Sequence, residues 1–317
     1  MALNLVVALA LSAASAPVPL ELPAPLPDPQ VETDNLRFAS DRTQRMTVPV
    51  RIGGTGPYSF FIDTGAERTV ISRELAERLR LQPGRSATIH SMSGVGTFST
   101  VVIPKLDVSK QSVVDIHAPA LSQTDLGGAG LLGVDSLQSQ NVVFDFKNRL
   151  LTMSKAKKRS RQAASGDAIV VTARSRFGRL ILADARLDGE KVWVIVDTGS
   201  QITIGNSALR QKLERKKRLR RPIVPIEIFS VTGGSTIGEY TSAAQFDLGR
   251  VRLEDMPIAF ADVHPFRMLD LADRPAMLLG MDALQAFDRV SVDFLNRQVR
   301  FTLPDANAGP RFRLAAL

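Results

Sequence analysis

The chain has 317 residues, of which 44% are hydrophobic and 23% charged, a composition typical of folded globular proteins and not of disordered or collagen-like chains. Its net charge is +8, because 40 Lys and Arg residues outnumber 32 Asp and Glu residues. It has no Cys, which excludes thiol nucleophiles, disulfides and Cys-ligated metals. Its three His residues lie far apart, so the chemistry must come from carboxylates, hydroxyls, lysines or backbone groups.

The N-terminal segment has the pattern of an export signal. Residues 3–11 are apolar but too few to span a bilayer, and the small residues 12–16 follow them. Residues 1–16 therefore predict a cleaved signal peptide or an anchor, and an exported protein in the periplasm or another extracytoplasmic space. The alternative is an apolar N-terminal strand. The Pro-rich residues 17–30 favour extended geometry and indicate a tether.

The first of two similar units covers residues 46–153. Two β-rich runs surround a Gly-rich hairpin signal, and the second run ends at Asp63. A helix is expected over residues 72–81, with Ser72 as its N-cap. A Gly-containing hairpin tip and the sequence Leu-Leu-Gly-x-Asp at residues 131–135 complete the unit.

The second unit repeats these landmarks. Its apolar run ends at Asp197, a helix candidate covers residues 207 to about 219, and Leu-Leu-Gly-x-Asp returns at residues 278–282. The predicted segments are a signal or anchor over 1–16, a tether and leading segment over 17–45, a first lobe over 46–153, a basic linker over 154–167, a second lobe over 168–303 and a tail over 304–317.

A repeated Asp-Thr-Gly at the end of an apolar strand points to acid–base chemistry. One copy would be weak, but two copies, each followed at similar distance by Leu-Leu-Gly-x-Asp, are not chance. Glycine permits a tight turn whose N–H groups face the carboxylate, and the threonine hydroxyl can donate to the partner loop. Two such turns would bring Asp63 and Asp197 into contact, where they share one proton and activate a water molecule. The alternative is a duplicated structural module without catalysis.

The sequence resembles the retropepsin-like, or retroviral-type, aspartic peptidases, in particular bacterial exported members with two such units in one chain. The resemblance rests on Asp63-Thr64-Gly65-Ala66, Asp197-Thr198-Gly199-Ser200, Leu131-Leu132-Gly133 and Leu278-Leu279-Gly280. It implies a mainly β fold of two β-barrel lobes related by a pseudo-two-fold, each with one or two short helices. It also implies a polypeptide substrate in a cleft between the lobes, and neither metal nor cofactor.

The resemblance also assigns roles to residues. Asp63 and Asp197 are the expected catalytic pair. The expected supporting residues are Thr64, Gly65, Thr198, Gly199 and Ser200. The expected flap residues, which would contact substrate, are Ser93, Gly94, Val95, Gly96, Thr232, Gly233 and Gly234. Because both units lie in one chain, an intramolecular pseudo-dimer is expected, and a homodimer pairing like copies is the alternative.

The two copies differ directly after the Asp-Thr-Gly turn, where the first has Ala66 and the second has Ser200. If the Ser200 hydroxyl donates to the neighbouring carboxylate, Asp197 is the ionised member of the pair and Asp63 the protonated one.

Other motifs receive structural interpretations. Residues 128–133 match Gly-x-Gly-x-x-Gly but lack the buried strand that nucleotide binding needs. Asp135 and Asp282 repeat as well as the Asp-Thr-Gly aspartates, and their spacing to a Gln three residues later predicts helix capping. The basic run over residues 210–221 is a solvated helix face, with weak contact to an anionic membrane surface as the alternative. It has no interleaved aromatic residues, so nucleic-acid binding is not expected.

The sequence therefore predicts an aspartic endopeptidase that acts on extended polypeptides. Two alternatives stay open. The first is a non-catalytic peptide-binding or scaffold protein that kept the fold, and the second is a homodimer in which one copy of the motif is catalytic and the other structural.

Overall fold

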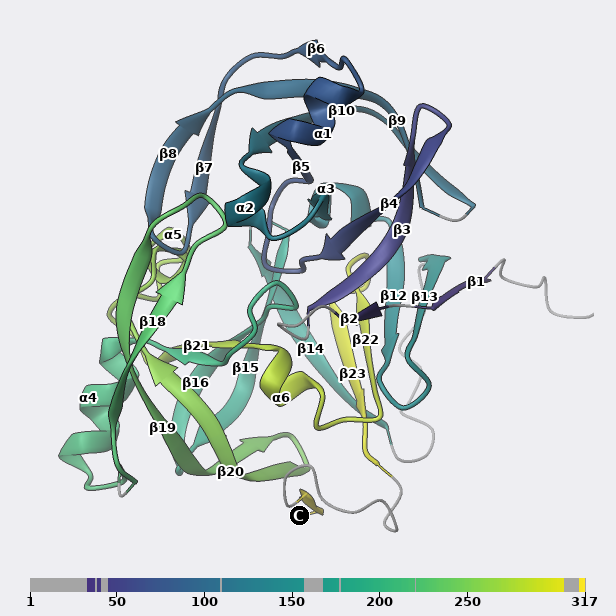
Figure 1. The fold of residues 1–317 in the computed structure, drawn as a ribbon. Helices are drawn as coiled ribbons and strands as arrows, with labels where there is room; N and C mark the ends of the chain where they lie inside the picture. Colours follow the sequence, from purple (N-terminus) through teal and green to yellow (C-terminus); the bar gives the residue numbers. More distant parts are fainter. Residues whose placement is uncertain are drawn as a thin grey trace, which may run out of the picture. The chain divides into compact units, whose positions relative to one another are not determined.

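The computed structural model describes residues 33–37, 39–40, 45–108, 110–156, 168–176, 178–219, 221–304 and 314–316. The predicted signal segment over 1–16 lies outside the described residues. The fold is mainly β, with 55% of the residues in strands, and consists of two closed six-stranded barrels with a few short helices (Figure 1). No helix within the described ranges is long and apolar enough to cross a membrane.

The first barrel closes because its first and last strands pair with each other. Its strands, in hydrogen-bonded order, are β3 (Met46–Ile52), β4 (Thr55–Ile62), β11 (Gly130–Leu132), β5 (Val70–Ser72), β10 (Gln111–Leu121) and β9 (Thr100–Val108). β9 pairs back with β3 and so closes the ring. Strand β3 shows why the sequence adopts this form: Met46, Val48, Val50 and Ile52 alternate with more exposed residues and are buried in the core.

The second barrel has the same strand order. Its strands are β15 (Arg179–Leu187), β16 (Glu190–Val196), β21 (Ala276–Leu279), β17 (Ile204–Gly205), β20 (Val251–Phe260) and β19 (Ser235–Leu248), and β19 pairs back with β15. Each strand thus has a counterpart in the first barrel, which confirms the predicted pair of β-barrel lobes.

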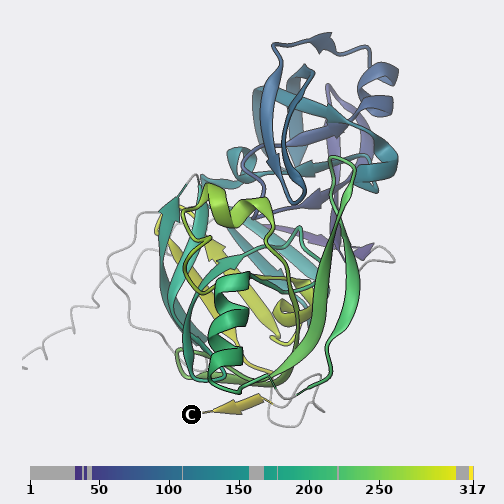
Figure 2. The same cartoon turned by 90° about the vertical axis from the view of Figure 1, so that its left-hand side faces the viewer.

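Short helices cover parts of both barrels. α1 (Arg73–Arg78) begins after Ser72, whose Oγ accepts a hydrogen bond from Leu75 N, as predicted for an N-cap. α4 (Ser207–Arg215) packs on the outside of the second barrel against β16 and β21 (Figure 2). It ends earlier than predicted, because Lys217 adopts a left-handed conformation with φ of 53° and turns the chain away.

A third sheet joins the two lobes. Its strands run in the order β1 (Thr33–Arg37), β13 (Leu150–Lys155), β12 (Gln140–Asp145), β22 (Arg289–Asp293), β23 (Gln298–Thr302) and β14 (Ala168–Arg176). The lobes meet where β12 of the first pairs antiparallel with β22 of the second. Strand β1 comes from the predicted tether, and β24 (Leu314–Ala316), from the predicted tail, pairs with β20.

Candidate active site

Both Asp-Thr-Gly turns begin where a buried barrel strand ends. β4 ends at Ile62 and β16 at Val196, so that Asp63 and Asp197 directly follow fully buried residues. Each turn is also hydrogen-bonded to the Leu-Leu-Gly strand of its own barrel. In the first lobe, Asp63 N donates to Leu132 O at 3.0 Å. The equivalent bond in the second lobe, from Asp197 N to the carbonyl of the last residue of β21, measures 3.1 Å.

The two threonines connect the turns across the lobes, as predicted. Thr64 Oγ1 donates to Val196 O at 2.9 Å, and Thr198 Oγ1 donates to Ile62 O at 2.8 Å. Each hydroxyl also accepts a bond from the backbone N–H of the other threonine, at 3.1 Å in both directions. Both side chains are buried, so this symmetric set of four bonds excludes water and fixes the two turns relative to each other.

Backbone N–H groups hold each carboxylate in the same way. Asp63 Oδ1 accepts from Gly65 N and Ala66 N, both at 2.8 Å. Asp197 Oδ1 accepts from Gly199 N at 3.0 Å and from Ser200 N at 3.2 Å. The second oxygen of each carboxyl is left for the partner aspartate or for a ligand.

The glycines of the two turns are required by the opposite aspartate. A Cβ on Gly65 would lie 2.5 Å from Asp197 Cγ, and a Cβ on Gly199 would overlap the Asp63 carboxylate. Neither glycine has a positive φ, so the requirement is close approach and not backbone conformation. The structure therefore places the two carboxyl groups side by side, each against the backbone of the other lobe.

Burial and proximity change the acidity of this pair. Burial raises the pKa of Asp63, although hydrogen bonds from Gly65 and the charge of Arg179 act against it. Burial also raises the pKa of Asp197, and the negative charge of Asp63 adds to this effect, bringing the pKa of Asp197 to about 7. The first proton is therefore lost from Asp63, and Asp197 keeps the second one close to neutral pH.

This order is opposite to the one expected from Ser200. The Ser200 hydroxyl donates to Ile202 O at 2.7 Å and not to a carboxylate. The hydroxyl consequently gives Asp197 no additional hydrogen bond, and the backbone bonds to the two carboxylates are alike on both sides. The premise that Ser200 favours an ionised Asp197 is wrong.

Asp135 and Asp282 lie inside the short helices at these positions and are not their N-caps. The N-caps of α3 (Val134–Leu137) and α6 (Met281–Leu284) are glycines without a side-chain bond. Asp135 accepts instead from Thr69 N and Thr69 Oγ1, at 2.9 and 2.7 Å, and Asp282 accepts the same two bonds from Thr203, at 3.0 and 2.7 Å. These carboxylates therefore brace the strand that follows each Asp-Thr-Gly turn, and the capping prediction is wrong.

The two flaps meet at their tips. The first flap is β7 (Ala87–Ser91) with β8 (Gly94–Phe98), and the second is β18 (Val224–Phe229) with the start of β19. Ser93 Oγ donates to Gly233 O at 3.2 Å, and Thr232 Oγ1 donates to Ser91 Oγ at 2.7 Å.

Each tip also packs a side chain on the opposite lobe. Met92 packs against the hydrophobic cluster of the second lobe around Phe266, and Val231 packs against the cluster of the first lobe around Phe61. Two histidines add a further link: His90 of β7 and His264 at the start of α5 (His264–Met268) share a hydrogen bond of 2.7 Å and stack.

A cavity of about 310 Å³ lies at the carboxyl pair. Its lining includes both aspartates, the flap arms over 88–92 and 226–231, and apolar residues such as Ile195, Leu131 and Leu278. The expected flap residues over 93–96 and 232–234 are not among its lining residues; they form the tips or, like Val95, are exposed to solvent.

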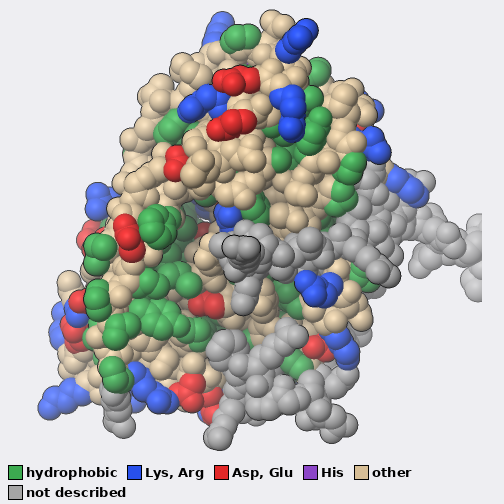
Figure 3. Space-filling model, viewed as in Figure 1, with side chains coloured by type: hydrophobic (Ala, Val, Ile, Leu, Met, Phe, Trp, Pro, Cys, Tyr) green, Lys and Arg blue, Asp and Glu red, His purple; other side chains and the backbone are tan. Residues whose placement is uncertain are grey.

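The second flap exposes several large hydrophobic side chains. In the space-filling view, hydrophobic side chains gather on the side where Figure 1 shows β18 and β19 (Figure 3). The large exposed hydrophobic residues of this hairpin and the residue before it are Ile223, Val224, Phe229 and Ile237.

Arg179 is a residue of the cavity that the sequence analysis missed. It is the first residue of β15, is only 4% exposed, and its Nε donates to Gly65 O of the other lobe. The sequence did contain a signal, because Arg45 precedes Asp63 by the same 18 residues by which Arg179 precedes Asp197.

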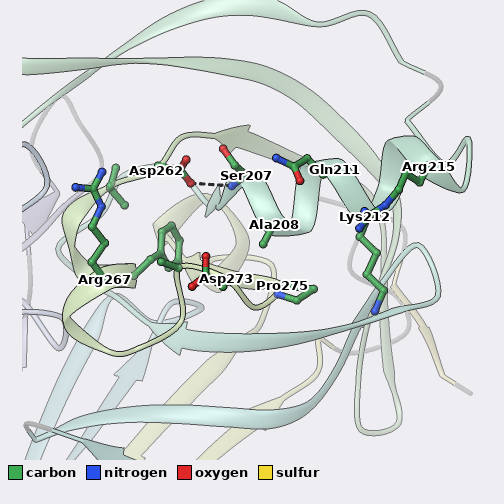
Figure 4. A pocket seen from close by; sticks show the side chains of 12 residues that line it. Ser207, Ala208, Gln211, Lys212, Arg215, Asp262, Arg267, Asp273 and Pro275 are labelled. Carbon is green, nitrogen blue, oxygen red and sulfur yellow. Dashed lines mark hydrogen bonds between the residues drawn. The ribbon is translucent and has the colours of Figure 1, made fainter.

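A second cavity, of about 540 Å³, lies away from the aspartates between α4 and α5. Its lining combines cations such as Lys212 and Arg267 with the carboxylates Asp262 and Asp273 (Figure 4). Asp262 accepts a hydrogen bond from Ser207 N and so holds the start of α4.

Comparison with known families agrees with the fold and with the arrangement of the turns. Residues 48–139 match the family described as "gag-polyprotein putative aspartyl protease", and residues 183–283 match the family described as "Aspartyl protease". No curated protein matches the sequence. The chain thus carries two aspartyl protease domains, which together fit an intramolecular pseudo-dimer.

Proposed function

We propose that the protein is an aspartic endopeptidase that hydrolyses peptide bonds in extended polypeptides, with Asp63 and Asp197 as its catalytic pair. The observation that carries this proposal is the pair itself: two carboxyl groups, Asp197 buried and Asp63 partly buried, each packed against the glycine of the other lobe. Two carboxyl groups at this separation hold one proton between them over a range of pH, which is the state that acid–base hydrolysis requires.

In this mechanism the two aspartates have different tasks. The Asp63 carboxylate takes a proton from a water molecule, which attacks the carbonyl carbon of the peptide bond. Asp197, which keeps its proton longer, donates it to the carbonyl oxygen as the tetrahedral intermediate forms. The threonine bonds keep both carboxyl groups in place, so that little reorganisation is needed during the reaction.

The cavity supports an extended polypeptide as substrate. The arms of both flaps are strands that border the carboxyl pair, and an extended peptide can add its backbone hydrogen bonds to such strands. Apolar side chains such as Ile195, Ile226 and Leu278 form its walls, so hydrophobic substrate side chains beside the cleaved bond are expected.

The test compares wild-type protein with Asp63→Asn and Asp197→Asn on a diverse peptide pool, with cut sites read by mass spectrometry. We expect cleavage by the wild type, loss of cleavage in both variants, and little change in folding. Retained activity in one variant would contradict the shared-proton pair and favour a homodimer with one catalytic copy. A folded wild type that neither cleaves peptides nor binds a transition-state mimic with a central hydroxyl would favour the peptide-binding protein.

We also propose that the protein acts outside the cytoplasm, from the signal pattern over residues 1–16. The basic run over 210–221 would add at most a weak contact with anionic membranes, since Lys212 and Lys216 already pair with Glu190, and Arg221 with Asp255. Fractionation of cells that express the full chain tests the first point. Unchanged membrane co-fractionation after neutralising Lys216, Lys217 and Arg218 would contradict the second.

A further inference from the structure

Arg179 of the second lobe brings a buried positive charge to the carboxyl pair. Its guanidinium Nε donates to Gly65 O, on the Asp63 turn of the opposite lobe, and its Nη1 lies 3.2 Å from Met268 Sδ. The same Gly65 peptide donates its N–H to Asp63 Oδ1. Arg179 therefore holds the residue that positions the first carboxylate.

The charge of Arg179 is matched by acidic groups around it. Burial lowers the pKa of Arg179, and the negative charges of Asp197, Asp63 and Glu67 act in the opposite direction. The basic side chains on this side are Arg267 and His264 of α5, with His90 beside them on β7. A buried cation is costly unless an anion compensates it, so Arg179 favours the state in which the pair carries a negative charge.

The equivalent residue of the first lobe behaves differently. Arg45 precedes Asp63 by the same number of residues and also borders the cavity. Its guanidinium, however, lies 3.9 Å above the Phe61 ring and donates to Leu126 O at 3.2 Å. The two arginines thus form a matched pair in sequence with different contacts: Arg45 binds Phe61 and Leu126 of its own lobe, and Arg179 binds Gly65 of the other lobe.

We propose that Arg179 is a positioning residue whose positive charge sets the pH range over which Asp63 and Asp197 hold a single proton. Its attraction to the ionised carboxyl groups favours the loss of both protons, so the pH range of the singly charged state is shifted towards acid pH. The proposal deepens the proposed function and rests on it, because the activity it tunes is peptide hydrolysis by this pair.

The test uses pH profiles of kcat/KM for wild type, Arg179→Met, Arg179→Gln, Arg179→Lys and the control Arg186→Met, at an exposed position on the same strand β15. Without the charge, both limbs of the profile move to higher pH by about one unit. On the acid limb this corresponds to a loss of about tenfold at fixed pH. Gln keeps a donor for Gly65 O but not the charge and should behave like Met, whereas Lys keeps the charge and should stay close to wild type. Arg186→Met should leave both limbs in place.

Unmoved limbs in folded Arg179→Met and Arg179→Gln would overturn the proposal, as would a profile that moves with Lys but not with Gln. Folding of each variant is checked by circular dichroism. A readout independent of activity is the NMR titration of ¹³C-labelled aspartate carboxyl groups, in which the signals of the pair should titrate at higher pH in Arg179→Gln. If the wild type cleaves no peptide, the proposed function fails, while this titration still decides whether Arg179 acts on the pair.

Discussion

At the scale of single residues, the two turn glycines show how closely the lobes approach. Each glycine lies so close to the aspartate of the other lobe that a side chain on it would overlap the carboxyl group, as a Cβ on Gly65 would overlap Asp197. A methyl group at this position must displace the aspartate, because the other side of the turn is fixed by backbone bonds.

Gly65→Ala should therefore lower kcat/KM by roughly two orders of magnitude or more, since catalysis depends on carboxyl positions within fractions of an ångström. Steady-state kinetics on a cleaved peptide provide the measurement. The matched control is Ala66→Ser, which introduces the residue found in the second lobe; the Ser200 hydroxyl there bonds a backbone carbonyl and leaves the carboxylate alone. Equal losses in both variants would contradict the steric argument.

The raised pKa of Asp197 also predicts how stability depends on pH. Its pKa of about 7 in the folded chain lies above the value of about 3.9 for an unfolded chain, so the folded state binds the extra proton between these values. The contribution of Asp197 to the free energy of unfolding is fully present below pH 4 and is lost as the pH rises through 7. The amide of Asp197→Asn does not ionise, so this variant keeps its stability at high pH. At pH 8 it should be more stable than wild type by roughly 1–3 kcal/mol.

Urea denaturation at pH 4 and pH 8 tests this prediction. The difference between Asp197→Asn and wild type should shrink at pH 4, where the wild-type carboxyl is protonated as well. Asp184→Asn, at an exposed position on β15, serves as control and should show no such pH-dependent gain. If Asp197→Asn were less stable than wild type at pH 8, the negative charge of ionised Asp197 would be compensated by its surroundings, and the prediction would be wrong.

At the scale of elements, the flaps close the cavity through contacts that protonation can break. The hydrogen bond between His90 Nδ1 and His264 Nε2 needs one ring nitrogen without a proton. Burial lowers the pKa of His264, and the nearby charges of His90, Arg267 and Arg179 lower it further. The neutral ring is thus favoured in the closed flap, and the contact is lost as pH falls below about 6.5.

We therefore expect the flaps to open more widely at pH 5 than at pH 7.5. Because the chain has no Cys, spin labels on Val95→Cys and Ile237→Cys would mark the two exposed flap strands uniquely. Double electron–electron resonance should give a broader distance distribution at pH 5. The same labelled chain with His264→Gln should lose this pH dependence, and a distribution that broadens equally in both chains would exclude the histidine contact as its cause.

The elements also show which predictions the sequence could support. The barrel strands, the buried position of the Asp-Thr-Gly turns and the threonine bonds follow from local patterns repeated in both halves. The roles of Asp135, Ser200 and Arg179 could not be predicted, because their partners are more than 60 residues away or depend on the orientation of one hydroxyl. The two Gly-containing hairpin tips were predicted at the correct positions, but their contact with each other is a tertiary feature without a local signal.

At the scale of the whole molecule, the sheet between the lobes carries a charged contact. Asp145 of β12 accepts from Arg289 Nη2 of β22 at 2.7 Å, and also from Asn148 N at 2.9 Å. Burial would raise the pKa of Asp145, but the bonds from Arg289 and Asn148 outweigh it and lower the pKa. Stability from this group is therefore present at neutral pH and is lost as pH falls below about 3.9.

Arg289→Met should destabilise the protein by about 1 kcal/mol at pH 7, a small effect because the arginine is half exposed. Thermal unfolding at pH 7 and pH 3 provides the measurement, and the loss relative to wild type should be smaller at pH 3. The control is Arg300→Met on the adjacent strand β23. A loss that is the same at both pH values would show that the side chain acts through packing rather than through its charge.

The continuous sheet from β13 through β22 has a consequence for how the protein behaves at low concentration. Both aspartates belong to one covalent chain, so neither can drift away from its partner as concentration falls. Turnover per molecule should stay constant on serial dilution, whereas an enzyme made of separable subunits loses activity when its subunits dissociate at low concentration. If the proposed activity holds, compounds that separate the subunits of dimeric enzymes should not inhibit this protein, whereas compounds that fill its cleft should.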